Sequence, residues 1–133
     1  MRSGCTTRRN AIQTGWIALV LAVAMGFPAA VWPAAPPSAV PAEFKRGEAA
    51  FNGHCARCHG ERGVGTSQGP PFVHKIYEPN HHGDAAFQRA AAMGVRAHHW
   101  QFGDMPKIPG VTSAEVDEII KYVRWLQRQA GVY

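Results

Sequence analysis

The most regular pattern of apolar and polar positions lies near the C-terminus and predicts an amphipathic helix. Thr112 and Glu115 form a capping box at its start, and Gly131 lies beyond its end. The apolar positions between them recur every three or four residues and are Val116, Ile119, Ile120, Val123 and Leu126. A helix with this pattern buries one stripe and exposes the opposite face to water.

Two earlier segments also have helical periodicity. Residues 42–53 carry one apolar face, made of Phe44, Gly47 and Phe51. Residues 84–94 begin with Asp84, a favoured N-cap residue, and end at a glycine. Met93, on this second helix, is expected in the core. Segments 59–83 and 95–111 are rich in Gly, Pro and His and predict loops, and no run alternates long enough for a strand. The predicted class is therefore all-α.

The N-terminus has the pattern of an export segment. Arg2, Arg8 and Arg9 precede an apolar run over residues 16–27, which is shorter than the roughly 20 residues that span a bilayer. Several prolines follow, and signal cleavage is expected after Ala24, Ala30 or Ala35. An uncleaved membrane anchor through residues 16–32 is the alternative.

These features divide the chain into three parts. Residues 1–35 are a signal peptide or N-terminal anchor, residues 36–41 are a linker rich in Pro and Ala, and residues 42–133 are one small domain. The net charge of +5 is concentrated in the first part, because the remainder holds eleven basic and nine acidic residues. Such a nearly neutral domain excludes nucleic acid as a partner.

Cys55-Ala56-Arg57-Cys58-His59 is the C-x-x-C-H pattern of covalent c-type haem attachment. The thiols of Cys55 and Cys58 add to the two vinyl groups of one haem, and His59 becomes an axial ligand of its iron. A zinc site would need more ligands, and the third cysteine, Cys5, lies in the export segment. A thioredoxin-type motif would need neighbouring strands. One covalent haem c is therefore predicted.

Haem attachment and export support each other, because the thiols must meet the haem outside the cytoplasm. The predicted location is the bacterial periplasm, where the protein is either soluble or tethered to the inner membrane.

Met105 is the predicted sixth ligand of the iron. It lies in a loop, between Asp104 and Pro106, just before the last predicted helix. Its neutral thioether favours ferrous iron and raises the reduction potential relative to a second histidine. His98 and His99 are the competing ligands.

At this point the chain resembles a class I monohaem cytochrome c of the bacterial, exported kind, over residues 42–129. Gly47, Phe51 and Cys55 repeat the family's spacing of four and four before the attachment motif, and Tyr122 matches its aromatic position on the terminal helix. The resemblance implies a small fold with three main helices and loops wrapped around one haem. It also implies that the first and last helices cross at the glycine and the aromatic residue.

Gly69-Pro70-Pro71-Phe72 is similar to the family's G-P-x-hydrophobic element. The resemblance implies that the carbonyl of Pro70, or less favourably that of Pro71, accepts the ring N–H of His59 and so orients the axial ligand.

The histidine content departs from the family pattern. Two adjacent pairs flank the second predicted helix, His81 with His82 and His98 with His99. They could form a surface copper or zinc site, although loop histidines that cap helices or contact haem propionates are the simpler interpretation. Arg96 and Trp100 are further candidates for contact with the haem edge or propionates.

The predicted function is one-electron transfer between periplasmic redox proteins, a donor and an acceptor, by a monomer that is not itself an enzyme. Two alternatives remain: a haem subunit of a larger oxidase or dehydrogenase, and a haem- or copper-binding sensor or metal-handling protein that uses the extra histidines.

Overall fold

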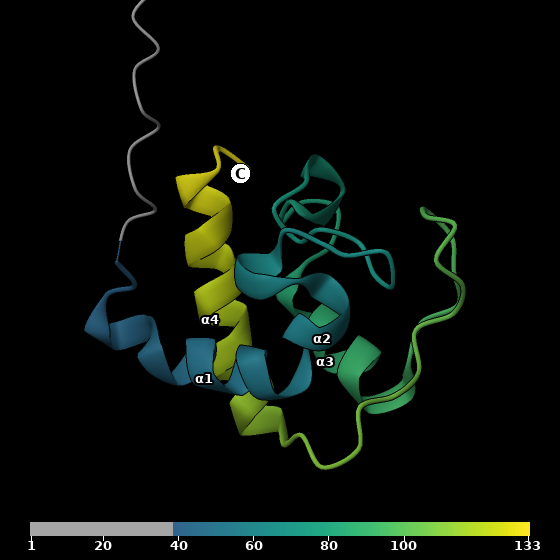
Figure 1. Ribbon diagram of the computed structural model, residues 1–133, viewed down its shortest axis with the longest axis horizontal. Helices are drawn as coiled ribbons and strands as arrows, with labels where there is room; N and C mark the ends of the chain where they lie inside the picture. Colours follow the sequence, from purple (N-terminus) through teal and green to yellow (C-terminus); the bar gives the residue numbers. More distant parts are fainter. Residues whose placement is uncertain (1–38) are drawn as a thin grey trace, which may run out of the picture. The chain divides into compact units, whose positions relative to one another are not determined.

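The computed structural model describes residues 39–133, which form a helical domain (Figure 1). Its α-helices are α1 (Lys45–His54), α2 (Ala56–His59), α3 (Asp84–Met93) and α4 (Ser113–Gln129). Short 3-10 helices cover Ala42–Phe44, Glu61–Gly63 and Lys75–Tyr77. The predicted signal or anchor (1–35) lies outside the described residues, as does the first part of the predicted linker.

The all-α prediction is confirmed, since residues 39–133 contain helices and no strand longer than one isolated bridge. The sequence located α1, α3 and α4 but placed some boundaries differently. The predicted first helix is a 3-10 turn followed by α1, and a further helix, α2, forms inside the cysteine motif. The expected loop over residues 59–83 includes two 3-10 turns.

Two residue assignments on α3 were wrong. The N-cap is Gly83, and Asp84 is the first helical residue, whose carboxylate accepts a hydrogen bond from Arg124 on α4. Met93 is 71% exposed and does not belong to the core. In a short helix rich in alanine, the apolar residues do not mark one face, so helical periodicity could not predict which face is buried.

The predicted crossing of α1 and α4 at Gly47 and Tyr122 is confirmed. A Cβ atom at Gly47 would lie 2.7 Å from the Tyr122 Cβ and would overlap the carbonyl oxygen of Glu118. The two backbones therefore touch at a point where only glycine leaves room. Figure 1 shows α1 lying across the lower half of α4.

The core fills the angle between these two helices. Phe51 and Tyr122 are fully buried and meet edge to face, with ring centroids 5.6 Å apart. Phe72 reaches the same cluster from the loop after α2. Val40, in the segment predicted as a linker, is 8% exposed and packs in this core, so ordered packing begins before residue 42.

The capping box predicted at the start of α4 is confirmed. The Thr112 hydroxyl accepts a hydrogen bond from the backbone N–H of Glu115, and the Glu115 carboxylate accepts one from the backbone N–H of Thr112. The predicted apolar stripe is buried. In the C-terminal half of α4 all sides of the helix are buried, since all six residues from Tyr122 to Gln127 are covered. The C-terminal half of α4 is thus a central element rather than a surface helix.

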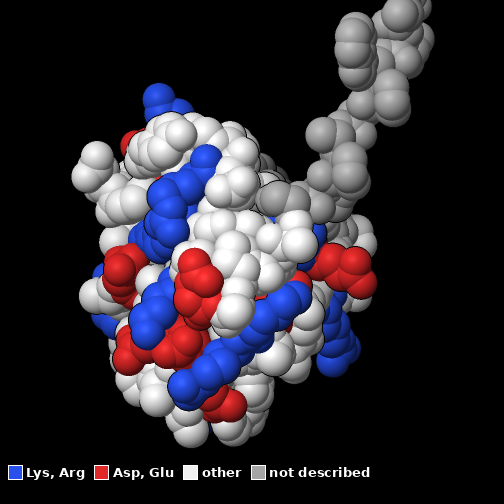
Figure 2. Space-filling model, turned by 90° about the vertical axis from the view of Figure 1, so that its left-hand side faces the viewer, with Lys and Arg blue, Asp and Glu red and all other residues white. Residues whose placement is uncertain are grey.

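Charges of both signs are interspersed over the α1–α4 side (Figure 2). Lys45 pairs with Glu48 and Lys121 with Glu118, each at 2.8 Å. This face therefore lacks the single-sign patch that binds polyanions. No helix within residues 39–133 combines the length and apolar character needed to cross a bilayer.

Replacing Gly47 with alanine is expected to lower the free energy of unfolding by about 2 kcal/mol, because α1 must move away from α4 to admit a methyl group. Gly53→Ala is the matched control: it lies on the same helix and has nothing within 4 Å of its Cβ position. The control should be neutral or stabilising by up to about 1 kcal/mol. Denaturant titration measures both, and equal effects would contradict the close crossing.

Candidate haem site

A cavity of about 600 Å³ lies beside the cysteine motif. Its wall contains all the residues predicted from the sequence to hold a cofactor, namely Cys55, Cys58, His59, Pro70 and Met105. They come from segments separated by up to 50 positions. Apolar side chains make up much of the remaining wall, among them Phe72, Phe87, Ile108, Val116 and Ile119.

The two thiols are positioned by the turn from α1 into α2. Cys55 ends α1, where its backbone N–H donates to the carbonyl of Phe51 (2.8 Å). Cys55 and Cys58 are both half-buried, and no disulfide joins them. Burial, with a smaller contribution from Cys58, raises the pKa of the Cys55 thiol to about 11. The Cys55 thiol is therefore protonated, and both cysteines line the cavity, one helical turn apart.

His59 is buried, at 7% exposure, and its orientation is fixed by a hydrogen bond. The Nδ1 atom lies 2.9 Å from the carbonyl oxygen of Pro70, the contact that the family resemblance predicted for this pair. A carbonyl can only accept, so Nδ1 carries the proton. Burial lowers the pKa of His59, and the bond to Pro70 opposes this only in part. The ring is thus neutral, and Nε2 keeps its lone pair for a metal.

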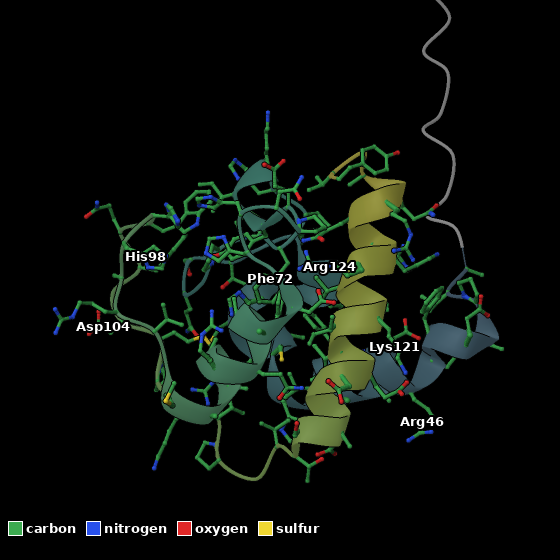
Figure 3. The ribbon with its side chains drawn as sticks, turned by 180° about the vertical axis from the view of Figure 1, so that it is seen from behind. Arg46, Phe72, His98, Asp104, Lys121 and Arg124 are labelled. Carbon is green, nitrogen blue, oxygen red and sulfur yellow. The ribbon has the colours of Figure 1, made fainter. Side chains whose placement is uncertain are left out.

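Phe72 is a site residue that the sequence analysis missed. Its ring stacks on the His59 imidazole, with centroids 4.1 Å apart and an angle of 20° between the planes. Figure 3 shows Phe72 in the interior of the domain, beside α4. It lies two residues after Pro70, so one short segment supplies both a hydrogen bond to the edge of the imidazole and a contact to its face.

Met105 is held at the base of a loop. Its backbone exchanges two hydrogen bonds of 2.9 Å with Val95, which closes residues 95–105 into a hairpin-like segment (Figure 1, green). Gly94 has a φ of +79°, and a Cβ there would lie 2.5 Å from the Met105 carbonyl oxygen. The C-terminus of α3 therefore fixes the backbone of Met105 at the cavity wall.

A family model described as cytochrome c matches residues 44–127, which is more than half of the chain. The chain belongs to the cytochrome c family. No curated protein and no solved structure matches it. Membership of the family implies a haem c with its iron, a role in haem-based electron transfer, and a protein that works outside the cytoplasm.

The wall of the cavity fits such a group. The apolar side chains suit a porphyrin, and the two thiols face the cavity beside the buried His59. The indole N–H of Trp100 is buried without a hydrogen-bond partner, although buried donors are nearly always paired. Trp100 lines this cavity together with Arg96. A haem propionate would give the indole N–H an acceptor and Arg96 an opposite charge.

A buried polar network behind the cavity was not predicted. Arg124 on α4 donates to the backbone carbonyls of Tyr77 (2.8 Å) and His82 (2.6 Å), and its Nε donates to Asp84 (2.8 Å). Gln127, one turn later, donates to the carbonyls of Phe72 and Tyr77, both at 2.9 Å. Figure 3 shows Arg124 pointing inward from α4. The two side chains attach the cytochrome's 72–82 loop to its central helix.

The residues next to Arg124 in the sequence could have predicted this network. Arg124 stands between Val123 and Trp125, in a run where apolar residues occur on every side of the helix. A charged residue that cannot reach the surface has to find internal partners.

Arg124→Met is expected to lower the free energy of unfolding by about 3 kcal/mol, because it leaves the His82 carbonyl and the Oε1 atom of Gln127 without the donor that Arg124 supplies. Arg128→Met, on an exposed position of the same helix, should change it by less than about 0.5 kcal/mol. Thermal or denaturant unfolding followed by circular dichroism compares the two. A loss of unfolding free energy in Arg124→Met no larger than that in Arg128→Met would show that the network contributes no stability.

Proposed function

We propose that this cytochrome is a periplasmic carrier of single electrons, with one haem c attached through Cys55 and Cys58 and ligated by His59 and Met105. The observation that carries the proposal is the state of His59. It is a buried, neutral imidazole whose Nδ1–H is taken by Pro70, beside two reduced thiols at the wall of an apolar cavity.

The haem supplies an iron that alternates between the ferric and ferrous states as it accepts and donates one electron. The protein's task is to keep the coordination the same in both states. The hydrogen bond from His59 to Pro70 makes the imidazole a stronger donor and prevents its rotation, and the stacked Phe72 limits tilting. The apolar wall excludes water from the iron.

Met105 is the preferred sixth ligand because its backbone is fixed while its side chain borders the cavity. Met93 also borders the cavity, but it is 71% exposed. A thioether supplied by Met105 would stabilise ferrous over ferric iron and would leave no open ligand position for carbon monoxide or peroxide. This favours electron transfer over gas binding or peroxide reduction.

The donor and the acceptor are proposed to be other periplasmic redox proteins. Electron-transfer partners meet briefly over interfaces at the small end of the observed range, below about 1,200 Å². The export segment predicted at residues 1–35, cleaved or retained as an anchor, supports this location.

Met105→Ala tests the sixth ligand. The purified ferric variant should lose the visible band of methionine-ligated haem and bind carbon monoxide readily in the ferrous state. Its reduction potential should fall by on the order of 0.1 V, a part of the roughly 0.8 V range that axial ligands set. Met93→Ala is the matched control and should change none of these. Absence of this band from the parent, together with carbon monoxide binding in His98→Ala or His99→Ala but not in Met105→Ala, would reassign the ligand.

Replacing Cys55 or Cys58 with alanine tests the attachment. Each variant should hold its haem through one thioether at most, and the double variant should release it in acidified acetone, since only thioether bonds resist that extraction. Cys5→Ala is the control and should retain all of its haem. Intact-protein mass spectrometry after co-expression with a maturation system measures the outcome, and covalent haem in the double variant would refute the assignment.

A further inference from the structure

Four histidines outside the set proposed to hold the haem line one part of the same cavity. His81 and His82 lie in the turn before α3, and His98 and His99 lie in the loop after it. The loop after α3 runs back toward the turn before it, so pairs that are 17 positions apart in the sequence meet in space. Figure 3 shows His98 on the loop side of the domain, remote from α4.

The histidine cluster is compact, and one of its nitrogen–nitrogen distances matches that between two ligands of one ion. Within residues 39–133, one group of potential ligands is compact enough to bind a metal, and it consists of His81, His82 and His99, whose ligand atoms all lie within 4.8 Å of one another. The Nε2 atoms of His81 and His99 are 3.1 Å apart. Two nitrogens bound to one tetrahedral ion at 2.0–2.1 Å would be about 3.3 Å apart.

In two of the four histidines, the second ring nitrogen has the kind of partner that metal-bound histidines usually have. His82 donates from Nδ1 to the Ile76 carbonyl (2.6 Å), and His98 donates from Nδ1 to the Arg96 carbonyl (2.8 Å). Each bond leaves Nε2 with a free lone pair and fixes the plane of the ring. The His98 and His99 ring centroids are 4.3 Å apart, but His98 is not part of the compact group of ligand atoms.

Both segments that carry the histidines are fixed to the rest of the domain. Arg124 donates to the backbone carbonyl of His82 (2.6 Å), and the Asp104 carboxylate accepts from the backbone N–H of Ala97 (2.8 Å). His81 and His99 are exposed, so an ion can reach them from solvent. A preorganised and open set of imidazoles is the ligand type that zinc and copper prefer over calcium or magnesium.

We propose that His81, His82 and His99, with His98 adjacent, form a site for one divalent transition-metal ion of the zinc or copper class. The ion would join the turn before α3 to the loop after it. Because that loop leads directly to Met105, occupancy would stabilise the segment that supplies the proposed sixth ligand. The proposed ligands are distinct from His59 and Met105, and the proposal rests on the proposed function in one respect: His99 is available to a second ion because Met105, and not His99, is taken as the sixth ligand of the haem iron.

Titration of the purified holoprotein with Zn²⁺ in a calorimeter tests the proposal. Zinc is redox-silent, so any change in the haem spectrum would report a change at the haem and not electron transfer to the added ion. One equivalent should bind with a dissociation constant in the micromolar range or below. His81→Ala and His99→Ala should each weaken binding by at least about 10-fold. His74→Ala, an exposed histidine outside the cluster, is the control and should bind as the parent does.

A second measurement follows the melting temperature of the same holoproteins. Saturating Zn²⁺ should raise it by several degrees in the parent and in His74→Ala, but not in His81→Ala or His99→Ala. A parallel titration with Cu²⁺ tells which of the two ions the site prefers. Absence of stoichiometric binding, or binding that survives both substitutions, would overturn the proposal. Haem-spectrum changes in these variants with zinc affinity unchanged would also overturn it, and would assign the cluster to the haem propionates.

Discussion

Contact between the backbones of α1 and α4 at Gly47 is the constraint on which the rest of the domain depends. α1 leads directly into the cysteine motif, so the angle at which it crosses α4 sets where the two thiols and His59 lie relative to the core. Phe51, Tyr122 and Phe72 then fill the angle between the helices, and Phe72 also lines the cavity. A small domain has little core to spare, and here the haem cavity and the core share the residue Phe72.

Buried polar groups fix the position of the loops, as the close crossing of α1 and α4 fixes the position of the helices. The segment from residue 60 to residue 83 has little regular structure, yet it must present the Pro70 carbonyl and the Phe72 ring to His59. Arg124 and Gln127 hold it by donating to backbone carbonyls that would otherwise be buried without partners. The polar network therefore acts on the axial histidine indirectly, by fixing the loop that orients it.

The hairpin-like segment after α3 has two roles in these proposals. Its base holds the backbone of Met105 through the bridge to Val95, and its outer part carries His98 and His99 against His81 and His82. A ligand of the haem iron and a second metal site would then be carried by the same loop. Such sharing gives a physical route by which a bound ion could affect the haem, since both depend on the position of the same loop.

The sequence by itself determined what depends on neighbouring residues: the attachment motif, the capping box of α4, its buried stripe and the all-α class. The resemblance added the Gly47–Tyr122 crossing and the contact of His59 with Pro70. Only the tertiary structure decided which distant groups meet. The stacking of Phe72 on His59, the carbonyls that Arg124 reaches, the outward position of Met93 and the gathering of the histidines all join separate segments, and local patterns carry no information on such distances.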